Sequence, residues 1–153
     1  MVRLSQFDES ERRNLLELPC PAYPATPLVA GVRLAEARLV LISTAGLHRR
    51  SDRPFRLGES GYRLIPQECR ANELVMSHVS KNFDRTGFQQ DLNMVFPIDR
   101  LGELVAEGTV ASLAEYHYSF MGATDPTAME HEARQLAAIL RKDRVTAALL
   151  VPV

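Results

Sequence analysis

The sequence has little net charge, few cysteines and no long apolar run, and each shortage excludes a class of protein. Its 153 residues carry 18 Lys and Arg against 19 Asp and Glu, a formal net charge of −1, so nothing indicates a nucleic-acid or acidic-polymer partner. No apolar run is long enough to span a bilayer, and residues 1–9 lack the apolar core of a signal peptide. We therefore expect a cytoplasmic protein with no membrane partner.

The cysteines and glycines also exclude several kinds of site. Neither Cys20 nor Cys69 has a second cysteine two or three residues away, so a zinc or CxxC redox site is not expected. Two free thiols are favoured over a disulfide in a cytosolic chain. The absence of GxGxxG and GxxxxGK patterns excludes the usual nucleotide sites. We predict no metal site and no cofactor bound by this chain itself.

The pattern of apolar residues predicts an α/β fold in two parts. Residues 1–37 form a short helix over 8–17 and a proline-rich extended arm over 19–27. Residues 38–153 form an α/β domain, with strands at 38–44, 62–65, 74–76, 110–113 and 145–153 and with helices starting at Pro97 and at Asp125-Pro126. The expected fold is a Rossmann-like or flavodoxin-like three-layer sandwich with a mostly parallel, incomplete sheet. In such sheets, ligands bind past the carboxyl ends of the strands.

The first candidate site is segment 116–122, which leaves a strand and leads to a helix N-terminus. Free N–H groups at a helix N-terminus favour an anion. His117 could shuttle a proton near neutral pH, and Tyr118 and Ser119 add hydroxyls. Periodicity alone favours the alternative, in which residues 116–120 continue the strand, the aromatic rings pack and His117 faces solvent.

The second candidate site is the basic loop after the strand at 38–44. It contains His48, Arg49, Arg50 and Arg53, whose cations could hold a substrate carboxylate or phosphate. A solvated basic loop without a ligand is the alternative.

A third candidate combines His78 with the acidic and amide residues that follow it. His78 closes a strand, and Asp84, Asp91 and Asn93 lie between it and the helix at Pro97. Such a cluster could relay protons or bind metal, but its spacing matches no metal motif. In the alternative, Asp84 forms a turn and the other two side chains cap local backbone.

Several runs in these loops occur together in the order found in one protein family. The runs are 46–48 with 52–55, 61–66, 77–78 with 83–84, 91–101, and 117–122 followed by 149–153. As a set over residues 38–153 they resemble the selenoprotein B family, the substrate-activating subunits of glycine, sarcosine, betaine and D-proline reductases. Residues 1–37 match more weakly.

The resemblance implies reductive cleavage of a C–N bond. In that family a selenocysteine or cysteine attacks the substrate carbon attached to nitrogen, a pyruvoyl group on a partner subunit activates the amine where it is used, and other subunits complete the electron transfer. The family's nucleophile lies just after the strand that ends here at Val153, so no residue of this chain matches it. We expect the reading frame to continue through an in-frame UGA codon, which would place a selenocysteine after Val153.

The resemblance also assigns roles to the candidate residues. The residues expected to support catalysis are His117, Tyr118 and Ser119, and those expected to bind substrate are His48, Arg49, Arg50, Arg53, His78, Asp91 and Asn93. His117 would orient or protonate the leaving amine, while the arginines would hold the carboxylate. Expected partners are the pyruvoyl-containing subunit, other reductase subunits and a small amino-acid or betaine-like substrate.

Two alternatives remain open at this point. The chain could bind an amino-acid-like carboxylate without turnover, or it could be a scaffold subunit that docks a partner through the proline-rich arm. As a fragment it is expected to be inactive alone. A final strand without a following helix would leave apolar surface on one sheet face, so we also expect a homo-oligomer.

Overall fold

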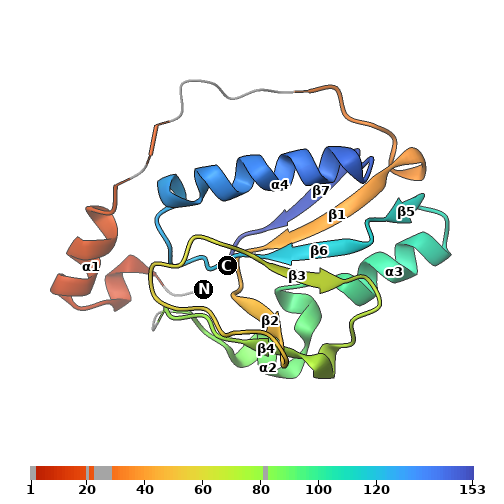
Figure 1. The fold of residues 1–153 in the computed structure, drawn as a ribbon. Helices are drawn as coiled ribbons and strands as arrows, with labels where there is room; N and C mark the ends of the chain where they lie inside the picture. The colour runs from red at the N-terminus through yellow and green to blue at the C-terminus, as the bar shows by residue number, and fades with distance from the viewer. Residues whose placement is uncertain (1–2, 20, 23–28, 81–82) are drawn as a thin grey trace.

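A computed structural model describes residues 3–19, 21–22, 29–80 and 83–153 (Figure 1). The strands are β1 (Arg38–Ser43), β2 (Leu47–Arg49), β3 (Arg63–Pro66), β4 (Leu74–Met76), β5 (Ser112–Leu113), β6 (Tyr116–Ser119) and β7 (Ala147–Val151), and the α-helices are α1 (Glu9–Leu16), α2 (Thr86–Gln90), α3 (Ile98–Ala106) and α4 (Glu130–Lys142). Cys20 and most of the predicted proline-rich arm lie outside the described residues.

The main sheet is built around β1, whose apolar run suits a strand covered on both faces. On one side β1 pairs in parallel with β5 and then with β6, and on the other side it pairs in parallel with β7. The outer strand β3 is antiparallel to β6. The sheet is therefore mostly parallel, and the predicted strand–helix–strand unit ending in β7 is confirmed.

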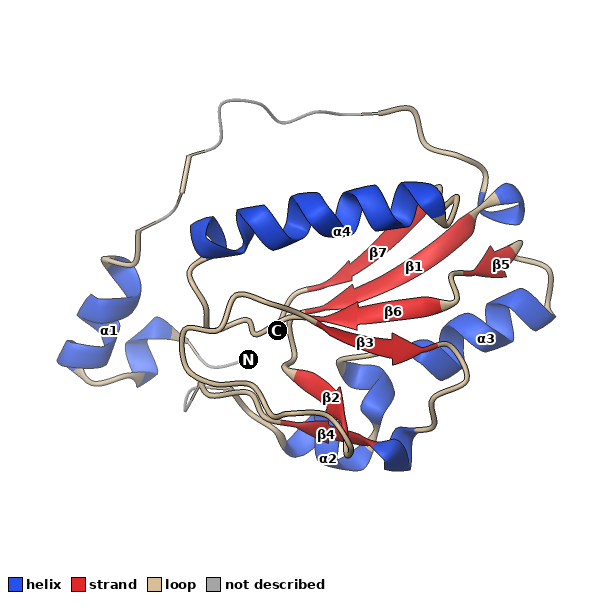
Figure 2. Cartoon of the chain, viewed as in Figure 1, coloured by secondary structure: helices blue, strands red, loops and turns tan. Residues whose placement is uncertain are grey.

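Alternating side chains of β1 pack into two separate cores, one on each face of the sheet. Leu39 and Leu41 belong to a cluster that includes Leu101 of α3. Val40 points to the opposite face, where its cluster includes Leu136 of α4. Figure 2 shows α4 along one face of the sheet and α3 along the other. The predicted α/β fold class, an incomplete three-layer sandwich with a mostly parallel sheet, is confirmed.

A break between β5 and β6 corrects one prediction about His117. Leu39 pairs with Leu113 and Ile42 pairs with Tyr118, so the partner strand holds two extra residues between these pairs. The N–H of Leu41 donates instead to Nδ1 of His117, at 3.1 Å. Residues 116–119 do continue the strand as expected, but His117 is fully buried, and the expectation that it faces solvent is wrong. The imidazole takes the place of a missing backbone acceptor.

The helices begin and end close to the predicted positions. Asp8 accepts a hydrogen bond from the N–H of Glu11 at 2.8 Å and caps α1. Asp125 accepts from the N–H of Thr127 at 2.9 Å, and a 3-10 turn over Pro126–Met129 leads into α4. Pro97 is the N-cap of α3, so the helix begins at Ile98, one position after the predicted first helical residue. None of the described helices combines the length and apolarity that crossing a membrane requires.

A small two-stranded ribbon, β2 paired antiparallel with β4, projects from the end of β1. Strand β4 was predicted, whereas β2 falls in the segment expected to be a basic loop. The register joins Leu47 to Met76 and Arg49 to Leu74. His78 therefore follows the end of the ribbon next to β1, and Arg49 lies at the opposite end. This placement separates two of the candidate sites.

Candidate functional site

Three segments meet where the parallel strands of the main sheet end. The segment after β1 donates from the N–H of Gly46 to the carbonyl of Phe120, at 2.8 Å. In the segment after β6, the N–H of Gly122 donates to the carbonyl of Thr44, also at 2.8 Å. The segment after β7 joins them, because the hydroxyl of Thr44 accepts from the N–H of Val153 at 2.8 Å. This carboxyl edge is the place where α/β sheets bind ligands.

Two glycines allow these segments to approach one another closely. Gly46 has a φ of 65°, and a Cβ there would lie 3.1 Å from backbone atoms of His78. A Cβ at Gly122 would overlap the backbone oxygen of Val153 and lie 3.0 Å from the carbonyl of Thr44. A larger residue at either position would force the strand ends apart, so both glycines are needed for the shape of the edge.

A pocket of about 250 Å³ opens at this carboxyl edge. Its lining residues are His78, Ser80, Phe83, Gly122, Ala123 and Val153. A second pocket of about 240 Å³ shares Phe83 and Val153 with the first and is otherwise lined largely by apolar side chains, among them Phe88 and Met94. We refer to the first as the His78 pocket. It is small and partly polar, as a site for a small polar molecule should be.

His78 gives the pocket a hydrogen-bond donor. Its Nδ1 accepts from the N–H of Ser80 at 3.2 Å, so in the neutral ring the proton is on Nε2. Nε2 is buried and has no hydrogen-bond partner among the residues that the structure describes. The ring packs against Phe83, with centroids 5.0 Å apart. The backbone of Val153 raises the pKa of the ring as a nearby acceptor does, but it forms no hydrogen bond of normal geometry with Nε2. A buried N–H without a well-formed bond is costly, and a ligand oxygen in the pocket would satisfy it.

Arg85 makes the electrostatics of the pocket favourable for an anion. Its guanidinium donates to the carbonyl of His78 at 2.5 Å and to the carbonyl of Ser80 at 3.2 Å. Burial, reinforced by the charge of Arg85, lowers the pKa of His78 below its ordinary value, and the backbone of Val153 offsets this only in part. The ring is therefore neutral at neutral pH, and it can donate from Nε2 without carrying a charge of its own.

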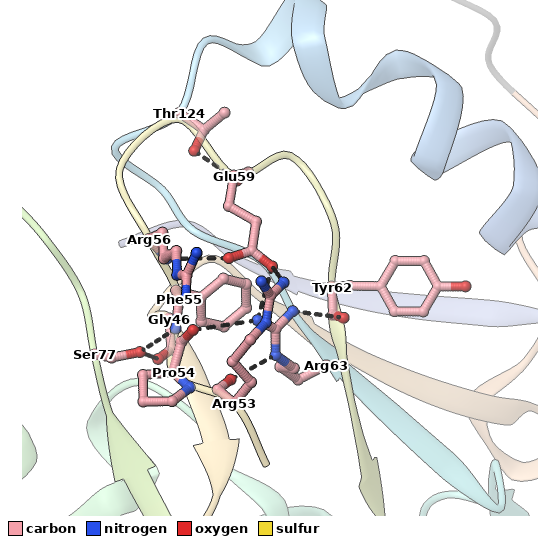
Figure 3. Close-up of polar contacts among 10 residues, drawn as sticks. All are labelled: Gly46, Arg53, Pro54, Phe55, Arg56, Glu59, Tyr62, Arg63, Ser77 and Thr124. Carbon is pink, nitrogen blue, oxygen red and sulfur yellow. Dashed lines mark hydrogen bonds and ion pairs between the residues drawn. The ribbon is translucent and has the colours of Figure 1, made fainter.

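Residues 53–63, which we call the strap, cross the carboxyl edge (Figure 3). The strap ends in β3, where Arg63 pairs with Ser119 of β6, and two hydrogen bonds attach it beside the pocket. The N–H of Phe55 donates to the hydroxyl of Ser77 at 2.9 Å, and the hydroxyl of Thr124 donates to the carbonyl of Glu59 at 2.9 Å. Ser77 precedes His78 and Thr124 follows Ala123, so each attachment lies one residue from the lining of the pocket.

The three residues expected to support catalysis have structural partners rather than access to the pocket. His117 bonds Leu41 inside the sheet, and burial lowers its pKa to about 4. Tyr118 packs edge-on against Tyr62 in the core beneath α4, with ring centroids 5.3 Å apart. The buried hydroxyl of Ser119 accepts from the N–H of Leu47 at 2.8 Å. Their roles in catalysis stay predictions.

Arg49 and Arg50 of the basic loop line a different pocket from His78, and the cations of this loop are paired locally. Arg49 forms an ion pair with Asp52 at 3.1 Å, and Arg50 donates to the carbonyl of Asn72 at 2.8 Å. Arg53 pairs with Glu59 of the strap at 2.7 Å. His48 is buried in β2, where its Nδ1 donates to the carbonyl of Arg49 at 2.8 Å. Substrate binding by these residues stays a prediction.

A third pocket, of about 350 Å³, lies at the basic end of the ribbon. It is lined by Arg49, Arg50, Ser51, Asn72 and Glu73. The structure thus keeps the pocket at Arg49 and Arg50 and the His78 pocket as two distinct places, whereas the resemblance groups their residues in one substrate site.

Asp84, Asp91 and Asn93 do not join His78 in a polar cluster. Asp84 accepts from the N–H of Thr86 at 2.9 Å and lines the second pocket. Asp91 accepts from the N–H of Asn93 at 2.9 Å, and the side chain of Asn93 accepts from the N–H of Asp99 at 3.1 Å at the start of α3. These bonds match the local capping considered as the alternative. Within the described ranges no group of His, Cys, Asp and Glu side chains is arranged to hold a metal.

Cys69 does not have the environment of a nucleophile. It is buried, and burial together with the charge of Glu73 raises the pKa of its thiol. A reactive cysteine needs the opposite shift, because the thiolate is the attacking species. Cys69 is a free thiol, as expected. Cys20 lies outside the described residues.

Sequence reasoning identified His78 but missed most of its neighbours in the pocket. Phe83, Ala123 and Val153 carry no chemical signal of their own, and Arg85 lay in a segment without periodicity. The available signal was position, since Ala123 and Val153 follow two strands whose carboxyl ends share one edge. That signal could have placed both residues at the site.

Comparisons with known proteins agree with the family resemblance seen in the sequence. A family model described as glycine/sarcosine/betaine reductase selenoprotein B matches residues 61–153. The D-proline reductase subunit gamma of Acetoanaerobium sticklandii is 31% identical over 120 residues, which cover 76% of this chain and 49% of that protein. The glycine reductase complex component B subunit gamma of Carboxydothermus hydrogenoformans is 27% identical over 143 residues, covering 88% of this chain and 32% of that protein.

The matched region is a limited part of each of these relatives. The alignments span about half of the first protein and about a third of the second. No solved structure matches the chain.

Proposed function

The chain belongs to the selenoprotein B family of glycine, sarcosine and betaine reductases, and from this premise we propose that its carboxyl edge binds the small substrate of such a reductase. The reaction would be reductive cleavage of a C–N bond in a small amino acid or betaine. A selenol or thiol outside residues 1–153 would be the nucleophile. The chain alone would then bind substrate without turning it over.

The observation that carries this proposal is the buried Nε2–H of His78 at a small pocket on the carboxyl edge, which makes no hydrogen bond of normal geometry with any described residue. The substrates named for the family share a carboxylate, and a neutral imidazole donor beside the Arg85 cation suits that group. The pocket volume of about 250 Å³ suits a molecule the size of an amino acid. In this arrangement His78 orients the carboxylate and takes no part in bond breaking.

The proposal extends to partners named for the relatives. Both are subunits of multi-subunit reductases by their names. We propose that this chain also works with other reductase subunits, including one that carries a pyruvoyl group. A nucleophile placed just after β7 would face the His78 pocket, because Val153 lines that pocket. A thiol or selenol at a helix N-terminus there would have a lowered pKa.

Ligand titration of the purified chain tests substrate binding. Glycine, sarcosine, betaine and D-proline would be added to ¹⁵N-labelled protein while the amides of Ala123 and Val153 and the ring nitrogens of His78 are followed. We expect saturable shifts at these positions. The variant His78→Leu should weaken binding by about tenfold, because the donor at Nε2 is lost. Equal affinity, or shifts confined to residues 49–51, would contradict the proposal.

His48→Leu is the matched control for this variant. His48 is also a buried histidine whose Nε2 has no described partner, but it lies in β2 and does not line the pocket. Its replacement should leave the affinity unchanged. The proposed nucleophile after Val153 has a separate test, which is the DNA after codon 153. An in-frame UGA followed by a related reading frame supports that part of the proposal, and a UAA or UAG with no related frame removes it.

A non-catalytic binding module is the second candidate function. The feature that favours it is Cys69, the thiol that the structure describes, since its raised pKa does not suit attack on a substrate. Restoring a cysteine after Val153 and supplying a dithiol and the partner subunits separates the two functions. Amine release from a bound substrate supports the reductase, and saturable binding without release supports the module.

A further inference from the structure

The strap contains a compact charged network that the proposed function does not use. The carboxylate of Glu59 forms ion pairs with Arg53 and Arg63, each at 2.7 Å, and accepts from the N–H of Arg56 at 3.0 Å (Figure 3). Glu59 and Arg63 are largely buried, with side chains 16% and 13% exposed. Partly buried pairs that share several bonds hold their geometry better than exposed pairs do.

Arg63 connects this network to the rest of the strap. Its Nε donates to the carbonyl of Arg53 at 3.0 Å, and its guanidinium lies 4.2 Å from the centre of the Phe55 ring. Phe55 itself is buried. Burial alone would raise the pKa of Glu59, but hydrogen bonds from Arg63 and Arg56 and the charges of Arg63 and Arg53 outweigh it, so the pKa lies below its ordinary value. The carboxylate is therefore charged at neutral pH.

The network connects the two ends of segment 55–59, which carries both attachments of the strap beside the pocket. At one end Phe55 binds Ser77, whose hydroxyl also faces the carbonyl of Gly46 at 3.4 Å. At the other end the backbone of Glu59 binds Thr124. Figure 3 shows Ser77 and Thr124 on opposite sides of the strap, with the Glu59 carboxylate between them. Ser77 and Thr124 adjoin the two walls of the His78 pocket.

We propose that Glu59 is a positioning residue, which sets the distance between the two walls of the His78 pocket through the strap and thereby its affinity for ligand. The proposal rests on the proposed function for the part that concerns ligand. The part that concerns the walls stands on the contacts of the strap alone. Glu59 does not line the pocket, so it acts through Ser77 and Thr124.

The variant Glu59→Gln tests the proposal because it keeps the shape of the side chain and removes its charge. We expect amide hydrogen exchange to become about tenfold faster at both walls, at residues 77–80 and 122–124, because local opening of the edge becomes easier. With betaine and D-proline as probes, the affinity should fall about fivefold. Faster exchange at one wall only, or unchanged exchange, overturns the proposal.

Asp52→Asn is the matched control. Asp52 forms a similar ion pair with Arg49 and is 20% exposed, but its partner lies at the far end of the β2–β4 ribbon. Its loss should leave wall exchange and probe affinity unchanged. If Asp52→Asn alters them as much as Glu59→Gln does, the effect is a general loss of stability and the proposal fails.

The variant Thr124→Val provides a second test of the same proposal if Glu59→Gln does not fold. It removes one attachment of the strap and leaves the Glu59 carboxylate intact, and it should reproduce the faster exchange of both walls. Thr127→Val, which loses a hydroxyl bond to Asp125 in the turn before α4, is its control. If the native chain binds neither probe, the proposed function fails while hydrogen exchange still decides the role of the strap. If exchange rises but affinity does not fall, Glu59 is not a positioning residue.

Discussion

His117 and His78 have the same local hydrogen bonding in two different regions. In both rings Nδ1 accepts a backbone N–H, from Leu41 in one case and from Ser80 in the other. In both rings Nε2 is buried without a partner among the described residues. His117 is enclosed in the sheet near Phe96, with ring centroids 6.2 Å apart, whereas His78 forms a wall of a pocket.

The difference shows that access, and not the state of the ring, separates a structural histidine from a binding one. Both rings carry the proton on Nε2 when neutral, and burial lowers the pKa of both. Only the His78 proton can meet a ligand without opening the sheet. His117 instead supplies the acceptor that the break between β5 and β6 removes from β1. The following predictions test this contrast.

The largest expected loss of stability comes from adding a single methyl group at Gly122, on the carboxyl edge. A Cβ at Gly122 would overlap the backbone oxygen of Val153, so Gly122→Ala should destabilise the fold by about 3 kcal/mol or displace the edge. A Cβ at Gly102 in α3 would instead point into open space, with no neighbouring atom within 4 Å. Gly102→Ala should therefore stabilise the helix by about 1 kcal/mol. Urea unfolding measures both, and a Gly122→Ala variant as stable as the native chain would show that the edge is loosely packed.

Replacing His117 or His78 by alanine should lower the stability of the fold by different amounts. His117→Ala leaves the N–H of Leu41 without an acceptor in the core and creates a cavity, so we expect a loss of about 3 kcal/mol. His78→Ala should cost about 1 kcal/mol, because water from the adjacent pocket can bond the N–H of Ser80. Urea midpoints of the two variants test this order. Equal losses would mean that the pocket wall is as closed as the sheet interior.

The sequence predicted the large elements of the fold because each rests on local signals. The apolar run of β1, the short first helix and the Asp125-Pro126 start were all readable from the chain. β2 was not predicted, because it has only three residues and leads into a run of arginines, a pattern typical of a loop. The burial of His117 was not predicted either, because it depends on a register shift between strands far apart in the sequence.

The candidate site was less accessible to sequence reasoning than the fold was. The basic residues and His78 all follow strands, and the sequence does not show that β2 carries Arg49 away from the carboxyl edge. The strap shows the same limit, since its attachments join residues 22 and 65 positions apart. Long-range pairing of this kind comes from packing and not from local propensity.

A pH titration of stability should identify the enclosed histidine. The folded-state pKa of His117 is about 4, below the ordinary value of 6.5, so the unfolded chain binds the proton first as pH falls. The contribution is fully present above about pH 6.5 and is lost progressively toward pH 4, on the order of 3 kcal/mol in total. His117→Gln keeps an acceptor for Leu41 and does not titrate, so its stability should vary less over this window. Urea midpoints from pH 7 to pH 4 for both proteins measure the difference, and parallel curves would contradict the assignment.

The smallest effect on folding is expected at an exposed leucine of β7. Leu150 is 66% exposed on this strand, and the predicted homo-oligomer would cover such apolar surface. Leu150→Glu should change the free energy of unfolding by less than about 0.5 kcal/mol while lowering the mass measured by light scattering to that of a monomer. Leu57→Glu, at a leucine 82% exposed in the strap, should leave the mass unchanged. If native protein is already a monomer, or if both variants behave alike, β7 is not an interface, and burial of Leu150 in an assembly would not be part of how this chain works.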